Sequence, residues 1–89
     1  MKERLNENAV GLTFGSAAAT LHALWVIAVG AGFGQTLADW WHSVHFLSDM
    51  HVVSGFSLGT AVLGILGAFV LSYVLGRFLA ALWNLFSRK

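Results

Sequence analysis

Two long runs without charged residues constrain the fold of this chain more than any other feature. No Asp, Glu, Lys or Arg occurs in residues 10–34 or in residues 52–76. Each run is about 25 residues long, and a helix needs roughly 20 apolar residues to cross the hydrocarbon core of a bilayer. The sequence therefore predicts an all-α membrane protein, in which two transmembrane helices form a hairpin with a short interfacial helix between them.

The composition fits burial in lipid. Of the 89 residues, 57% are hydrophobic and 10% are charged, whereas soluble domains carry about 25% charged residues. A chain of this size has too little interior to bury so much apolar surface by itself. The absence of cysteine excludes disulfides and thiolate metal sites. No basic patch occurs away from the termini, so we expect no nucleic-acid partner.

The expected organisation is a single membrane hairpin over residues 1–89. Its parts are a first span at about 9–33, an interfacial segment at 35–51, a second span at about 52–77 and an amphipathic extension at 78–89. The second helix is expected to run without a break from Met50 to about Phe86. Ser48 or Asp49 is the expected N-cap of that helix.

Basic and aromatic residues predict the orientation. The five basic residues lie toward the termini, and they are Lys2, Arg4, Arg77, Arg88 and Lys89. The positive-inside rule then places both termini in the cytoplasm and the connecting segment in the periplasm of a bacterial inner membrane. The expected anchors at the membrane interfaces are Trp40, Trp41, Arg77 and Trp83.

Small residues recur at intervals of four along both spans. They are Gly11, Gly15 and Ala19 in the first span, Gly64, Ala68, Ser72 and Gly76 in the second, and the separate pair Gly55 and Gly59 just before the second series. Small side chains let helix backbones approach closely in lipid. Two such stripes permit one contact within the hairpin and a second between subunits. Both stripes can also face each other within one hairpin, or reflect the usual composition of membrane helices.

A cluster of polar residues between the spans is a candidate metal site. It consists of His42, His45, Asp49 and His51. Separations of three and four residues place side chains on one helical face, and imidazole with carboxylate suits divalent zinc, copper, nickel or iron. The alternative is that these side chains simply face water, because their spacing matches no established zinc signature.

His22 is the candidate cofactor ligand, because it lies near the middle of the first span, where an ionisable group is costly. It can form a hydrogen bond with a carbonyl or hydroxyl on the facing helix, or line a polar path. It can also bind a tetrapyrrole, since Ala18-x-x-x-His22 followed by Trp25 is similar to the histidine environment of photosynthetic antenna polypeptides. Those polypeptides span the membrane once.

Two segments resemble a family of small two-span bacterial membrane proteins of unknown function. One is the C-terminal Gly76-Arg-Phe-Leu-Ala-Ala-Leu-Trp-Asn-Leu-Phe86, and the other is the polar start Leu5-Asn6-Glu7-Asn8-Ala9. His45 and Asp49 echo a His and an Asp that many members carry between the spans, although the spacing here is one residue longer. The resemblance implies the two-span fold and no activity.

No pattern in the sequence is typical of an enzyme. It contains no nucleophile beside a base, no phosphate loop and no paired carboxylates. We therefore expect a non-enzymatic protein that acts by helix–helix assembly, as a homo-oligomeric scaffold or small pore. One alternative is an accessory subunit of a larger respiratory, photosynthetic or transport complex. Another is a metal-handling protein that uses the periplasmic His/Asp cluster.

Overall fold

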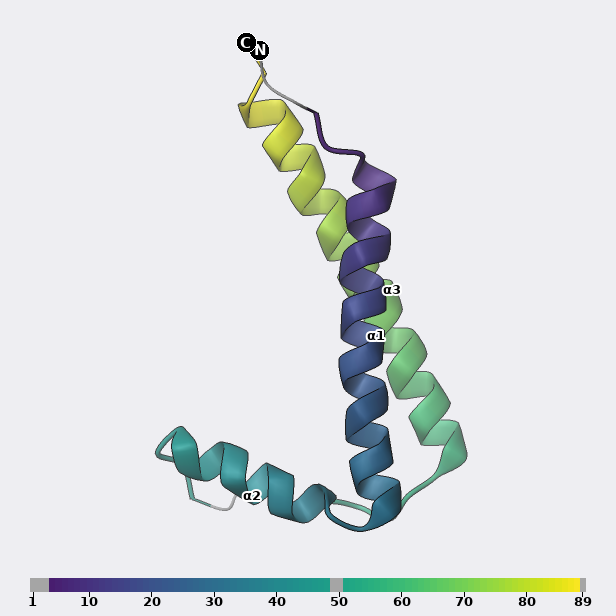
Figure 1. Ribbon diagram of the computed structural model, residues 1–89, viewed down its shortest axis with the longest axis vertical. Helices are drawn as coiled ribbons and strands as arrows, with labels where there is room; N and C mark the ends of the chain where they lie inside the picture. Colours follow the sequence, from purple (N-terminus) through teal and green to yellow (C-terminus); the bar gives the residue numbers. More distant parts are fainter. Residues whose placement is uncertain (1–3, 49–50, 89) are drawn as a thin grey trace.

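The computed structural model describes residues 4–48 and 51–88, which form three helices. These are α1 (Glu7–Ala31), α2 (Gly34–Val44) and α3 (Leu58–Phe86). Helices α1 and α3 lie side by side and run in opposite directions, so the start of α1 and the end of α3 share one end of the molecule (Figure 1). Helix α2 projects sideways from the other end.

Local signals in the sequence determine where α1 begins and ends. The Asn6 side chain accepts a hydrogen bond from the Ala9 N–H at 2.9 Å, which satisfies one of the unpaired donors of the first turn. At the other end, Gly32 has a φ of 97°, the left-handed conformation that commonly ends helices. Its N–H donates to the carbonyl of Ala28 at 3.1 Å. Helix α2 then begins two residues later.

Helix α3 begins at Leu58, so the expectation of a helix from Met50 is wrong. Its N-cap is Ser57, whose hydroxyl accepts from the Thr60 N–H at 3.4 Å. Residues 51–57 are not helical. The physical reason is that the main chain of this segment pairs with a side chain of α2, as described below, and those groups are unavailable for a helix.

Helix α2 covers only part of the interfacial segment expected at 35–51, because it ends at Val44. Phe46 follows with a φ of 63°, a left-handed conformation that is rare for an aromatic residue. The N–H of Leu47 donates to the carbonyl of His42 at 2.8 Å and closes the turn. Ser48 therefore lies beyond this turn, and Asp49 lies outside the described residues.

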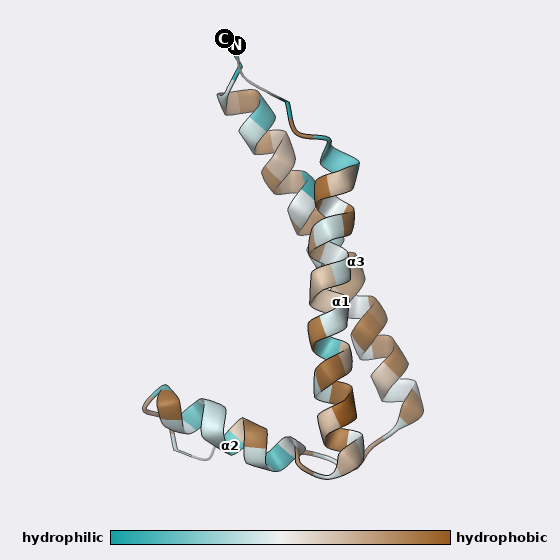
Figure 2. Cartoon of the chain, viewed as in Figure 1, coloured by the Kyte–Doolittle hydropathy of each residue, from teal (hydrophilic) through white to brown (hydrophobic). Residues whose placement is uncertain are grey.

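The described part of the molecule has no core of large side chains. Its buried apolar side chains are Ala28, Ala61 and Ala80. Large apolar side chains lie on the outside instead, with Leu21 68% exposed and Leu71 74% exposed. Hydrophobic residues recur along α1 and α3 (Figure 2). Both helices are long and apolar enough to cross a membrane.

The contact between α1 and α3 depends on glycine at four positions. A Cβ added to Gly76 would lie 2.9 Å from the carbonyl oxygen of Val10, and one added to Gly15 would lie 2.9 Å from that of Phe69. At Gly11, the nearest ring atoms of Tyr73 would be 2.9 Å away. Gly64 lies against His22. At Gly15 and Gly76 the backbone of the facing helix leaves no room for a side chain, and at Gly11 and Gly64 side chains of the facing helix already occupy the space.

The remaining small residues of the predicted stripes lie elsewhere. Ala19, Ala68 and Ser72 are half-buried along the pair. Gly55 precedes α3, and a Cβ added there would have no neighbour within 4 Å among the described residues. At Gly59 the only described neighbour of an added Cβ is the Ser57 hydroxyl at 4.0 Å, on the same chain segment. The glycine contact thus begins at Gly64.

Asn84 fastens the two chain ends together. Its Oδ1 accepts from the Leu5 N–H at 2.7 Å, and its Nδ2 donates to the Leu5 carbonyl at 2.9 Å. The side chain is buried, so these bonds satisfy an amide that would otherwise be costly to bury. Nearby, Arg77 donates to the Tyr73 hydroxyl at 3.1 Å and lies 3.7 Å from the Glu7 carboxylate.

Candidate functional site

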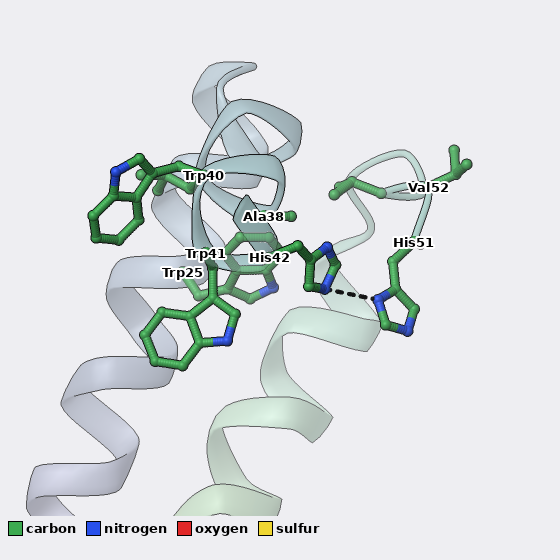
Figure 3. A pocket seen from close by; sticks show the side chains of 9 residues that line it. Trp25, Ala38, Trp40, Trp41, His42, His51 and Val52 are labelled. Carbon is green, nitrogen blue, oxygen red and sulfur yellow. Dashed lines mark hydrogen bonds between the residues drawn. The ribbon is translucent and has the colours of Figure 1, made fainter. Parts of the chain in front are cut away.

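The main cavity of the described structure lies where α1 ends, beneath α2. Its volume is about 510 Å³, within the range of about 300–1,000 Å³ that is usual for small-molecule sites. Three segments far apart in sequence contribute to its wall (Figure 3). The lining residues are Trp25, Leu37, Ala38, Trp40, Trp41, His42, His51, Val52 and Val53.

Aromatic rings form much of this wall. Trp25 comes from the second half of α1, and Trp40 and Trp41 come from consecutive positions of α2 (Figure 3). Trp40 and Trp41 are each more than half exposed, at 60% and 57%. Their role as anchors at a membrane interface stays a prediction. The same two residues therefore contribute to the cavity and to the outer surface of α2.

Gln35, in the first turn of α2, joins two parts of the cavity wall, α2 and the segment before α3. Its Nε2 donates to the carbonyl of His51 at 2.9 Å, and its Oε1 accepts from the Val53 N–H at 2.6 Å. The second hydrogen of Nε2 goes to Asp39 Oδ1 at 2.9 Å. The amide thereby pairs with one main-chain acceptor and one main-chain donor of the segment before α3, as a neighbouring β-strand does. This pairing places His51 opposite α2.

His42 and His51 form a hydrogen-bonded pair at one side of the cavity. Nε2 of His42 and Nδ1 of His51 are 3.1 Å apart (Figure 3). His42 is 8% exposed, whereas His51 lies at the surface. Within the described residues, His42 Nδ1 is buried and has no hydrogen-bond partner. A buried polar atom without a partner is costly.

The other members of the predicted metal cluster do not join this pair. The ring of His45 packs on Trp41, with centroids 4.3 Å apart, and its Nδ1 contacts the Trp41 carbonyl at 2.8 Å. Asp49 lies outside the described residues. Within residues 4–48 and 51–88, no three His, Cys, Asp or Glu side chains gather closely enough to hold a metal ion. Metal binding by the four residues stays a prediction.

His22 packs between the two long helices. Its Nε2 edge contacts the place on α3 where Gly64 lacks a side chain. A cavity of about 170 Å³ lies beside it, lined in part by Trp25, Phe56 and Thr60. Because Nε2 faces the backbone of α3, this edge of the imidazole occupies the space between the two helices at Gly64. A tetrapyrrole at His22 stays a prediction.

The remaining predicted anchors lie at the opposite end of the molecule from α2. Arg77 and Trp83 are both on α3, and both are exposed. They lie in the half of the helix that packs near the start of α1, where Arg77 also meets Glu7. The tryptophans predicted as anchors therefore lie toward both ends of the long axis of the molecule, which is 51 Å.

Two residues of structural importance were missed by the sequence analysis, and both are amides. Gln35 and Asn84 each bind a main-chain segment through a donor and an acceptor. A signal was present, because an amide within or beside a long apolar run needs a partner. Nothing in the sequence indicates which main-chain groups are the partners of these amides.

Comparison with protein-family models, with curated proteins and with solved structures found no match to this chain. The comparisons therefore assign no family. The resemblance of the C-terminal helix to the two-span family stays a prediction, and functional inference depends on the geometry described above.

Proposed function

We propose that this protein is a non-enzymatic integral membrane protein that acts by lateral helix–helix assembly, as a homo-oligomer of membrane hairpins. The observation that carries the proposal is the distribution of side-chain size over the α1/α3 pair. Small residues occupy the contact within the chain, bulky apolar residues cover most of the outside, and one outer face of α1 carries small residues.

The bulky outer surface supports the membrane placement. Leu21, Leu63 and Leu71 are 68%, 72% and 74% exposed, and similar side chains surround both helices. Soluble monomers rarely expose apolar surface so continuously, whereas lipid tails cover it without penalty. Helix α3, with 29 residues, is about 43 Å long and exceeds a hydrocarbon core of about 30 Å. We expect it to tilt or to project at its C-terminal end.

The basic residues support an orientation. Arg4 precedes α1 and Arg88 follows α3, and these two helix ends share the end of the molecule away from α2, while the segment between the helices carries no Lys or Arg. We therefore propose a bacterial inner membrane with both termini in the cytoplasm and with α2 at the periplasmic surface. His42 and His51 then lie at the periplasmic end.

A second contact surface lies on α1, away from α3. It consists of Thr13, Ser16, Ala17 and Thr20, which are all exposed. The hydroxyls of Thr13 and Thr20 each donate to the carbonyl four residues earlier at 2.8 Å, so they leave a smooth surface with satisfied donors. Such surfaces let helices pack closely in lipid. Since the hydroxyls are engaged within α1, this face favours a scaffold over a pore.

The proposal is tested by measuring self-association in lipid vesicles by energy transfer between labelled copies. Ala17→Leu places bulk on the proposed surface of α1, and Gly67→Leu is the matched control on the outer face of α3. A Cβ at Gly67 would have no neighbour within 4 Å among the described residues. We expect Ala17→Leu to weaken association by about 1 kcal/mol and Gly67→Leu to leave it unchanged.

Three results would contradict the proposal. The unmodified protein can remain monomeric at high protein-to-lipid ratios, which excludes self-assembly and leaves the accessory-subunit alternative. Gly67→Leu can weaken association while Ala17→Leu has no effect, which excludes the α1 surface. Both variants can associate as well as the unmodified chain, which excludes a contact through either face.

A further inference from the structure

We propose that water enters the molecule from the α2 end and fills the cavity beside His22, which makes this histidine a site for water and protons within the membrane. Three observations carry the inference: the polar lining of the cavity, the main-chain groups without partners before α3, and the close contact of the helices beyond His22. The inference rests on the proposed placement of α1 and α3 in a membrane, and its test distinguishes the two.

Polar side chains gather around the cavity of about 170 Å³ between α1 and the start of α3. Besides His22, its lining includes Ser54, Ser57 and Thr60, which all carry hydroxyls. A water molecule occupies about 30 Å³ in the liquid and makes roughly two to four hydrogen bonds inside a protein. The cavity therefore has the space and the polar groups for several water molecules.

The ring of His22 has no protein partner in the described part of the chain. No hydrogen bond between described residues reaches either of its nitrogens. Neither nitrogen is sealed from solvent, because the buried side-chain polar atom that lacks a partner among these residues belongs to His42. A neutral imidazole has one donor and one acceptor nitrogen, and water supplies a partner to both. His22 is also the one titratable residue in the lining of this cavity.

The segment before α3 adds main-chain groups that need water. The N–H and carbonyl groups of Ser54, Gly55 and Phe56 have no hydrogen-bond partner within the described residues. The ring of Phe56 lies beside the last turn of α1, 3.4 Å from where a Cβ of Gly30 would be. Non-helical main chain at membrane depth persists only where protein buries it or water reaches it. These three residues are exposed, so water is the partner that remains.

The cavity adjoins the α2 end of the molecule, and the helices close beyond it. Trp25 and Val53 line both this cavity and the larger one beneath α2, so the two cavities are neighbours. In the other direction, Gly64 lies against the ring of His22, and Gly15 lies against the main chain of α3. Water that enters from the α2 end therefore stops at His22.

Cysteine labelling tests the inference, because the chain contains no cysteine. His22→Cys is treated with a small membrane-impermeant methanethiosulfonate in cells with an opened outer membrane. Leu21→Cys is the matched control at the same depth, since Leu21 is 68% exposed on the outer surface of α1. We expect His22→Cys to react at least about ten-fold faster, because the reactive thiolate forms in water and is costly in lipid. Ser48→Cys, just past α2, should also react and reports the membrane placement.

A second measurement uses the unmodified chain in lipid nanodiscs, because cysteine is smaller than histidine and leaves extra space. We expect nuclear magnetic resonance to detect transfer of magnetisation from water to the ring hydrogens of His22. The methyl groups of Leu21 should show no such transfer. Transfer from lipid acyl chains to the His22 ring, with none from water, would overturn the inference.

The outcomes distinguish the water-filled cavity from the membrane placement. Labelling of Ser48→Cys alone overturns the cavity and leaves the placement. Rapid labelling of His22→Cys and Leu21→Cys alike places α1 in water and contradicts the placement on which the inference rests. Labelling of His22→Cys without water contact in the unmodified chain also overturns the inference, because the substitution then created the space.

Discussion

At the scale of single residues, two amide side chains fix the positions of main-chain segments that the apolar pattern of the sequence does not specify. Gln35 fixes the main chain of residues 51–53, and Asn84 fixes that of Leu5. Each amide matches a donor and an acceptor of the main chain at once. The two lie near opposite ends of the molecule, so each provides a control for the other.

The prediction at this scale concerns amide hydrogen exchange. Gln35→Ala removes the partner of the Val53 N–H. We expect the free energy of opening at that amide to fall by roughly 1 kcal/mol, the contribution of one hydrogen bond, so that its hydrogen exchange accelerates. The Leu5 N–H should be unaffected. Asn84→Ala should give the reverse pattern. Nuclear magnetic resonance in micelles measures both amides, and equal acceleration of both by either variant would refute independent fastening.

At the scale of helices, the stability of the α1/α3 pair depends on glycine, which has no side chain, at the points of closest contact. Gly76 and Gly67 illustrate this, since they lie on the same helix nine residues apart. A Cβ at Gly76 would lie 2.9 Å from the Val10 carbonyl oxygen, while one at Gly67 would have no neighbour within 4 Å among the described residues. Their environments differ although their local sequences are both apolar.

The prediction at this scale is a difference between two alanine substitutions. Gly76→Ala should lower the free energy of unfolding by about 1–3 kcal/mol, because the helices must separate to admit the methyl group. Gly67→Ala should leave that free energy unchanged or raise it, since alanine favours the helix. Denaturant titration in micelles measures both variants. Equal destabilisation by the two would contradict the close contact at Gly76.

The sequence predicted the elements better than their ends. Two charge-free runs were enough to predict α1 and α3. The start of α3 was predicted too early, because the preceding segment contains no proline that would indicate a break in the helix. The hydrogen bonds of that segment with Gln35, which is far away in sequence, could not be predicted from local sequence. The burial of His42 was missed for a similar reason, since it depends on where the segment around His51 folds back.

At the scale of the whole molecule, the orientation can be tested directly because the chain contains no cysteine. Ser48→Cys introduces a thiol just past α2, and Ser87→Cys introduces one at the C-terminal end of α3. We expect a membrane-impermeant maleimide, applied to intact cells with an opened outer membrane, to label the first and not the second. Labelling of Ser87→Cys alone would invert the orientation, and labelling of both would exclude a sealed two-span topology.

Lateral assembly in the membrane is the central claim, and native mass spectrometry of the protein extracted gently from its own membrane tests it most directly. The account predicts a discrete mass equal to a whole-number multiple of the 9.6 kDa chain, allowing for bound lipid or ligand. It also predicts that the fraction of chains with this mass falls in Ala17→Leu and is unchanged in Gly67→Leu. A monomer only, or a fixed ratio to larger unrelated proteins, would contradict it.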